Sequence, residues 1–144
     1  MIQSTKQHTL KSVITFKGIG LHTGEECTMT VNPTEGNHGY KFQRIDLEGQ
    51  PIIDACTKNV CSTLRSTSLG KDGVEIHTTE HILAALYASG VDNALIKLDG
   101  LEVPILDGSA AMFTESIEKS GTQELKEDRL YFKVRKNISY INKE

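Results

Sequence analysis

Two stretches of helical periodicity, set among segments with strand-like alternation, restrict most strongly how this chain can fold. The apolar side chains that recur at helical spacing are Ile82, Leu83, Leu86, Tyr87, Ala110, Phe113 and Ile117. This spacing predicts helices over 79–89 and 109–120, each with one apolar stripe. Both stripes need to be buried, and a single sheet face can cover them. We therefore predict an α+β fold, a two-layer sandwich of a mixed, mostly antiparallel β-sheet with two α-helices on one face.

The strands of this sheet are predicted mainly from the first third of the chain, where apolar and polar residues alternate. The segments predicted as strands are 9–16, 27–31, 40–45, 51–55, 74–76, 93–98, 102–106 and 130–134. Asp99-Gly100 predicts a hairpin turn between the strands at 93–98 and 102–106. The hydroxyl-rich stretch 58–71 is predicted as a long connecting loop that opens with a helical turn.

The ends of both predicted helices carry capping signals. Thr78 or Thr79 can cap the first helix, Glu80 stands where the helix dipole favours an anion, and Gly90 provides a C-terminal stop. Asp107-Gly108-Ser109 is predicted to cap the second helix. The acidic residues of the segment 99–110 could instead form a divalent-metal cluster, but turn and cap chemistry accounts for Asp99, Asp107 and Ser109 without a metal.

Length and charge exclude several classes of protein. The 144 residues suit a single domain, and 16 Lys and Arg against 19 Asp and Glu give a net charge of −3. Without a basic run, the chain lacks the electrostatic signature of a nucleic-acid-binding protein. No apolar run approaches the roughly 20 residues that span a bilayer, and residues 1–6 have no apolar stretch typical of a secretory signal. We expect a cytoplasmic protein without nucleic-acid partners or transmembrane segments.

The three cysteines, Cys27, Cys56 and Cys61, form no recognisable disulfide or zinc pattern. Their odd number and sparse distribution argue against a disulfide framework. Cys56 and Cys61 are separated by four residues, whereas structural zinc sites commonly have two between paired cysteines. We predict free thiols that are buried as small hydrophobic side chains.

Glu80 and His81, at the start of the first predicted helix, form the sharpest chemical feature. The positions that share a helical face with His81 are Ala84, Ala85 and Ala88, whose small side chains leave space for an ion or substrate. Glu80 lies about 100° around the same turn and could take a proton from water on a metal held by His81. A capping glutamate beside a structural histidine gives the same pattern, and one imidazole is not a zinc site. Spacing alone leaves both interpretations open, and the structural one is more common for an isolated motif.

A glycine-punctuated segment at 18–24 precedes the strand predicted at 27–31. Gly18, Gly20 and Gly24 differ by one residue from the dinucleotide-binding fingerprint. Because a strand rather than a helix follows, no helix N-terminus is available for a phosphate. The glycines are predicted to permit a turn or bulge that displays His22, and a turn histidine without a role is an equal alternative.

Three motifs in order resemble those of a known family. They are Gly18-Ile19-Gly20-Leu21-His22-Thr23-Gly24, Thr79-Glu80-His81-Ile82-Leu83-Ala84-Ala85-Leu86 with Gly90-Val91-Asp92-Asn93, and Glu102-Val103-Pro104-Ile105-Leu106-Asp107-Gly108-Ser109-Ala110. From about 9 to 134 the chain closely resembles the first half of UDP-3-O-acyl-N-acetylglucosamine deacetylase, a zinc enzyme family of bacterial lipid A synthesis. The resemblance implies two similarly folded α+β domains with the active site between them. It identifies residues 1–144 as the first of those domains.

The resemblance also implies roles for individual residues. His81 matches the zinc ligand that the first domain supplies, and Glu80 matches the general base that activates water against the acetamide carbonyl. Leu64 and Arg65 fall in a segment that lines the substrate site. His22 belongs to the glycine motif and is assigned with them to substrate binding. The implied cofactor is Zn²⁺, and the implied substrate is UDP-3-O-acyl-N-acetylglucosamine.

The remaining zinc ligands of the family, a histidine and an aspartate four residues apart, belong to the second domain. No His-x-x-x-Asp occurs in these 144 residues, so we expect the remaining ligands in a second domain of the same polypeptide and no activity from this domain alone. Without that domain, a surface including the Tyr87 side of the first helix, His22 or the 62–69 loop is expected to be exposed. The alternative is a free-standing module of the same fold that binds a sugar nucleotide or a partner without catalysis.

Overall fold

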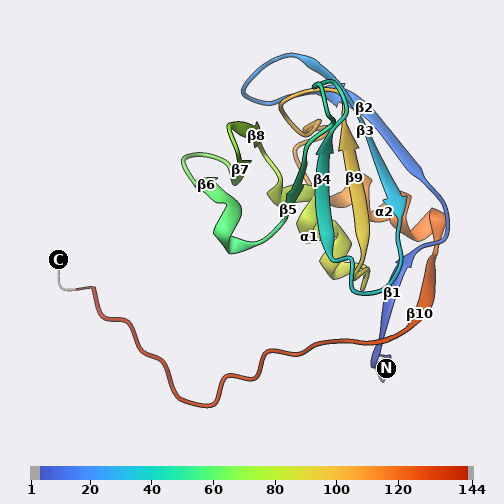
Figure 1. The fold of residues 1–144 in the computed structure, drawn as a ribbon, viewed down its shortest axis with the longest axis vertical. Coiled ribbons are helices and arrows are strands. Elements are labelled where there is room, and N and C mark those ends of the chain that lie inside the picture. Colours follow the sequence, from blue (N-terminus) through green and yellow to red (C-terminus); the bar gives the residue numbers. More distant parts are fainter. Residues whose placement is uncertain (1–3, 143–144) are drawn as a thin grey trace.

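The computed structural model describes residues 4–142 and contains three β-sheets and two α-helices (Figure 1). The strands of the largest sheet, in spatial order, are β2 (Ile14–Ile19), β3 (Glu26–Pro33), β9 (Ala94–Leu98), β4 (Tyr40–Arg44) and β5 (Ile52–Asp54). β4 and β9 pair in parallel, and the other neighbours in this sheet are antiparallel. Helices α1 (Glu80–Ala88) and α2 (Ala111–Ser120) pack together on one face (Figure 1). The predicted α+β sandwich is therefore confirmed.

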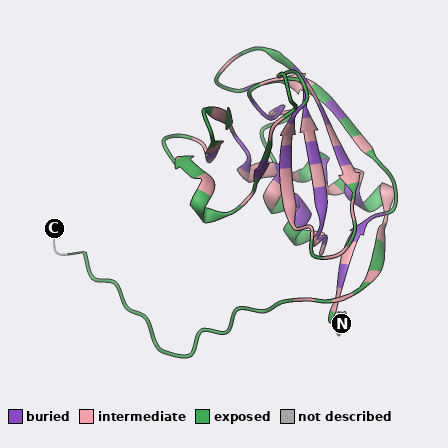
Figure 2. Ribbon diagram, viewed as in Figure 1, coloured by how far each residue is buried: buried purple, intermediate pink, exposed green. Residues whose placement is uncertain are grey.

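The strand register explains why the helices cover only one face. A row of apolar side chains crosses the five strands, formed by Ile14, Val31, Ile96, Phe42 and Ile53. Within this row every side chain except Ile14 is buried, and Figure 2 shows the buried positions alternating along the strands. The neighbouring row on the opposite face contains Thr30, Lys97 and Gln43. Since one face of the sheet is apolar and the other polar, the apolar stripes of the helices pack only on the apolar face.

The predicted helical stripes lie in the core. Ile82 and Leu86 of α1, and Phe113 and Ile117 of α2, are buried. The ring of Phe113 packs edge-to-face on Phe16 of β2, with 4.9 Å between ring centroids. These contacts fix both helices against the sheet.

A second sheet lies within the stretch that was predicted as a loop. Its three antiparallel strands are β6 (Val60–Ser62), β7 (Ser68–Lys71) and β8 (Val74–Ile76), preceded by the 3-10 turn η1 (Thr57–Asn59). The prediction of a loop over 58–71 is therefore wrong, although its helical opening is present. The missed signal is Asp72-Gly73, whose positive φ angles of 51° and 79° join β7 to β8 as a tight hairpin.

The ends of the domain pair with each other. The predicted strand at 9–16 is in fact two strands, because the exposed residues 11–13 separate β1 (Lys6–Leu10) from β2. β1 pairs with β10 (Thr122–Asp128), and residues 129–142 contain no helix or strand. The strand predicted at 130–134 is therefore wrong, and Figure 1 shows this segment leading away from the domain.

Two further predictions are corrected. The segment 102–106 makes only an isolated parallel bridge, from Glu102 to His77, so the hairpin predicted around Asp99-Gly100 is not formed. Pro104 has no N–H to donate to a strand ladder, and this favours an irregular path. Cys27 is buried as predicted, whereas Cys56 and Cys61 are exposed.

Within residues 4–142, no helix combines the length and the apolar character needed to cross a membrane. Residues 1–3, part of the N-terminal stretch predicted to lack a secretory signal, lie outside the described residues, as do residues 143–144.

Candidate active site

The first turn of α1 fixes Glu80 to the loop that connects β6 and β7. The backbone N–H of Thr67 donates to Glu80 Oε2 at 2.9 Å. Thr79, at the helix N-cap, donates both its hydroxyl at 2.9 Å and its N–H at 3.1 Å to the Thr67 carbonyl. The threonine therefore occupies the predicted capping position, but its side chain forms no helix cap and binds the loop instead.

His81 follows Glu80 and is half-buried. Of the alanines on its helical face, Ala85 is buried, whereas Ala84 and Ala88 are exposed, so the surface beyond His81 is open. Across the described residues, no group of three or more His, Cys, Asp or Glu side chains could hold a metal ion. Within residues 4–142, His81 therefore belongs to no such group, whereas a catalytic zinc takes about three protein ligands.

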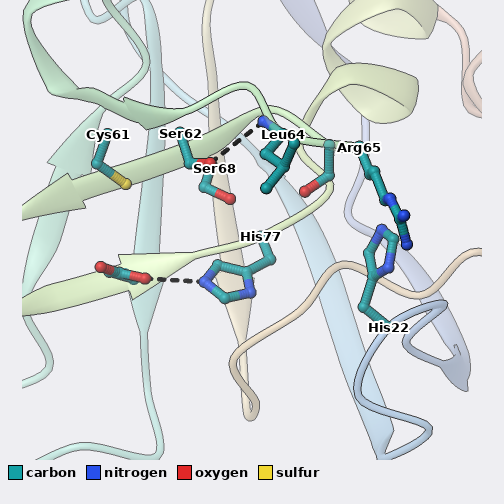
Figure 3. A pocket seen from close by; sticks show the side chains of 9 residues that line it. His22, Cys61, Ser62, Leu64, Arg65, Ser68 and His77 are labelled. Atoms are coloured by element: carbon teal, nitrogen blue, oxygen red, sulfur yellow. Dashed lines mark hydrogen bonds and ion pairs between the residues drawn. The ribbon is translucent and has the colours of Figure 1, made fainter.

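A pocket of about 450 Å³ adjoins this helix end. The residues that line it are His22, Cys61, Ser62, Leu64, Arg65, Ser66, Ser68, Glu75 and His77 (Figure 3). All three residues predicted to bind substrate are thus brought together, from two separate segments of the chain. Glu80 and His81 do not line the pocket, but Thr67, which binds Glu80, lies between the lining residues Ser66 and Ser68.

The pocket offers polar and cationic groups at its surface. Figure 3 shows the side chains of His22 and Arg65 on one side and that of Cys61 on the other. The Nε2 atom of His77 lies 2.9 Å from Glu75 Oε2, which orients the imidazole. A guanidinium with nearby imidazoles and hydroxyls can bind phosphate and sugar hydroxyl groups. Leu64, with 81% of its surface exposed, adds an apolar contact at the rim.

The turn that carries His22 is held by a buried carboxylate, Glu102. The N–H groups of His22 and Thr23 donate to Glu102 Oε2 at 3.1 and 2.8 Å, and the Thr78 hydroxyl donates to Oε1 at 2.6 Å. Burial opposes ionisation of Glu102, but the hydrogen bonds from Thr78, Thr23 and His22 outweigh it and lower the pKa of the carboxyl.

Sequence reasoning did not identify Glu102 or Thr67 as parts of this site. The alternation predicts Glu102 within a strand, and the signals against that strand are Pro104 and a charged residue within the apolar run 101–106. Thr67 acts through its backbone, so its residue type carries no signal. The surface expected to be exposed is exposed at Tyr87 and Leu64, each 81%, and at His22, whereas Ser68 and Leu69 are buried.

Comparison with known families places the chain in one of them. The family model described as UDP-3-O-acyl N-acetylglycosamine deacetylase matches residues 7–144. The chain belongs to this deacetylase family. The family predicted from the three motifs is thereby confirmed.

Similar members of the deacetylase family come from several bacteria. A protein of Bacteroides thetaiotaomicron named bifunctional enzyme LpxC/FabZ is 51% identical over 135 residues, covering 94% of this chain and 29% of that protein. The UDP-3-O-acyl-N-acetylglucosamine deacetylase of Geotalea uraniireducens is 46% identical over 133 residues, covering 92% of this chain and 43% of that protein. A second bifunctional enzyme LpxC/FabZ, from Porphyromonas gingivalis, is 47% identical over 139 residues, covering 96% of this chain and 30% of that protein. The chain thus spans less than half the length of these curated relatives.

Proposed function

We propose that this chain is the N-terminal half of a zinc-dependent deacetylase that removes the N-acetyl group of UDP-3-O-acyl-N-acetylglucosamine in lipid A biosynthesis. The observation that carries the proposal is the bond from Thr67 to Glu80, which links the predicted general base to the loop that lines the pocket. The deacetylase names of the relatives support the reaction class.

In this proposal His81 is the zinc ligand, and bound zinc supplies a Lewis acid and lowers the pKa of water. Glu80 takes the proton from the attacking water. Because the Thr67 N–H donates to Glu80 Oε2, Glu80 Oε1 is the oxygen that accepts the proton of the water. The water oxygen bonds to the acetamide carbonyl carbon, the C–N bond breaks, and the proton passes to the nitrogen. The products are acetate and the free 2-amine.

The pocket residues bind the substrate in this proposal. Arg65 and His22, on one side of the pocket, suit the anionic diphosphate and the hydroxyl groups of a UDP-sugar. Leu64 provides an apolar contact. None of these side chains transfers a proton in the reaction.

We infer further that a second domain of the same polypeptide completes the site. The relatives extend well beyond the matched region, and the described residues supply one histidine where a catalytic zinc takes about three protein ligands. The segment after β10 also exposes large apolar side chains, with Leu130 at 91% and Phe132 at 93%. Exposed apolar surface of this kind is typical of a contact with another domain.

The test uses the full-length enzyme and measures zinc content and acetate release from UDP-3-O-acyl-N-acetylglucosamine. His81→Ala should lose both zinc and activity. Glu80→Gln should keep its zinc and lose about 10²- to 10⁴-fold in kcat, the usual effect of losing a general base. Glu118→Gln, on the exposed side of α2, is the matched control and should behave as wild type.

Two outcomes would contradict the proposal. Wild-type turnover by Glu80→Gln would exclude Glu80 as the general base. Binding of the UDP-sugar by the wild-type enzyme without acetate release would favour a binding module of the same fold.

A further inference from the structure

Glu102 is a charged side chain in a place where charge is costly. Only 2% of its surface is exposed, and among the described residues no cationic side chain forms an ion pair with it. A buried carboxylate is tolerated when hydrogen-bond donors replace its hydration. Three donors serve this purpose here, the backbone N–H groups of His22 and Thr23 and the hydroxyl of Thr78.

These donors come from two segments that are distant in sequence. His22 and Thr23 belong to the glycine-punctuated turn, whereas Thr78 directly precedes the N-cap of α1. Glu102 thus joins the turn to the start of the helix through a single carboxylate. His22 lines the pocket, and the Glu80-His81 pair begins two residues after Thr78.

The local backbone is adapted to this carboxylate on both sides. A Cβ on Gly20 would lie 2.4 Å from Glu102 Oε2 and 2.3 Å from Thr23 Oγ1, so only glycine lets the turn approach so closely. Thr78 has a φ of 58°, a left-handed conformation that is costly for a β-branched residue. Its hydroxyl bond to Glu102 helps to hold this conformation.

We propose that Glu102 is a positioning residue that fixes the substrate-binding turn relative to the catalytic end of α1. The catalytic part of this inference rests on the proposed function. Glu102 itself touches no reacting atom: it acts through the backbone of the His22 turn and through Thr78. Replacing its charge should shift the pocket wall relative to Glu80 and His81, and a displacement of about 1 Å can reduce catalysis roughly 100-fold.

The first experiment measures amide exchange in the 144-residue chain and does not depend on activity. Glu102→Gln keeps the side-chain shape but turns one acceptor oxygen into a donor, which cannot accept from an N–H. The amides of His22 and Thr23 should exchange at least about tenfold faster, as expected for loss of a charge-assisted hydrogen bond. The amides of the β3–β9 ladder should keep their rates.

The matched control is Asp99→Asn. Asp99 Oδ1 also accepts a backbone N–H, from Thr28 at 2.6 Å, but this exposed bond joins the end of β9 to β3 and involves no predicted site residue. This variant should leave the exchange of His22 and Thr23 unchanged. Unchanged exchange in Glu102→Gln and in Glu102→Ala, which removes both acceptor oxygens, would show that Glu102 does not hold the His22 turn.

The second experiment measures kcat and KM in the full-length enzyme. Glu102→Gln should keep its zinc, raise KM and lower kcat, with a combined loss in kcat/KM of about 10- to 100-fold. Gly20→Ala, which displaces the same turn by steric contact, should give the same pattern, and Asp99→Asn should not.

The two experiments separate the failure of this inference from failure of the proposed function. Faster exchange with unchanged kcat and KM in both Glu102→Gln and Gly20→Ala would show that the contact is structural only, and would overturn the positioning role. A wild-type enzyme without deacetylase activity would overturn the proposed function and the catalytic part of this inference. The contact between Glu102 and the His22 turn would still be tested by amide exchange.

Discussion

The five-stranded sheet and the three-stranded sheet are held in place by different forces. The larger sheet buries continuous apolar rows under α1 and α2, whereas the buried apolar residues of β6–β8 are Leu69 and Ile76. The smaller sheet contributes these two side chains to the same core. It is also joined to the rest of the domain by polar contacts, from Arg44 to Glu75 and from Thr67 to Thr79 and Glu80. Burial of apolar side chains therefore stabilises the scaffold, and hydrogen bonds between distant segments position the site residues.

The largest effect on stability is expected from a substitution in the apolar core of the five-stranded sheet. Phe113 is fully buried between α2 and the sheet, so Phe113→Ala should reduce the free energy of unfolding by about 3–5 kcal/mol. Met112→Ala, at the neighbouring and 45% exposed position, should change it by less than about 0.5 kcal/mol. Urea unfolding checks both, and equal effects would contradict the assignment of the core.

A smaller effect is expected where the two sheets meet. Arg44 donates to both oxygens of Asp46 and, through Nη1, to the Glu75 carbonyl of β8 at 2.9 Å. Arg44→Ala should cost about 1.5–3 kcal/mol, because hydrogen bonds to a charged group are lost. It should also speed amide exchange in β8.

The control for Arg44→Ala is Lys17→Ala. The pair Lys17–Glu26 spans 3.3 Å with both side chains largely exposed, so its loss should cost about 0–1 kcal/mol. A loss from Arg44→Ala as small as that from Lys17→Ala would show that the small sheet does not depend on this contact.

Lowering the pH should weaken the hydrogen bonds to the carboxylates of Asp46 and Glu102. The pKa of Asp46 is lowered by its hydrogen bond from Arg44, and the pKa of Glu102 is lowered by its donors despite burial. Carboxyls with lowered pKa values bind protons more readily in the unfolded chain, so their stabilisation is complete at neutral pH and is lost as the pH falls below about 5. Urea unfolding between pH 7 and pH 3 should show this decline, with a shallower slope for Glu102→Gln. Stability that rises on acidification, or equal slopes for both proteins, would contradict it.

The scaffold could be predicted from sequence because its determinants are local and periodic. The alternation at Cys27–Val31 and the spacing of Phe113 and Ile117 fix which faces are buried, before any long-range contact is known. The hairpin of β7 and β8 was also encoded locally, in Asp72-Gly73, but the surrounding serines and threonines obscured it.

The site was predictable only in part. His22, Leu64 and Arg65 were assigned together from the family resemblance, and the structure places them around one pocket. The contacts that hold them, through Glu102 and the backbone of Thr67, join segments that no spacing rule relates. A buried carboxylate satisfied by backbone N–H groups has no sequence pattern, since its donors can be any residues.

The central claim, a zinc site divided between this chain and a second domain, is tested most directly by calorimetric titration of zinc. The 144-residue chain should show no stoichiometric binding that depends on His81, because it contributes one ligand where about three are needed. The full-length enzyme should bind one zinc, lose it in His81→Ala and keep it in the control His38→Ala. Tight 1:1 binding by the 144-residue chain that His81→Ala abolishes would contradict a divided site.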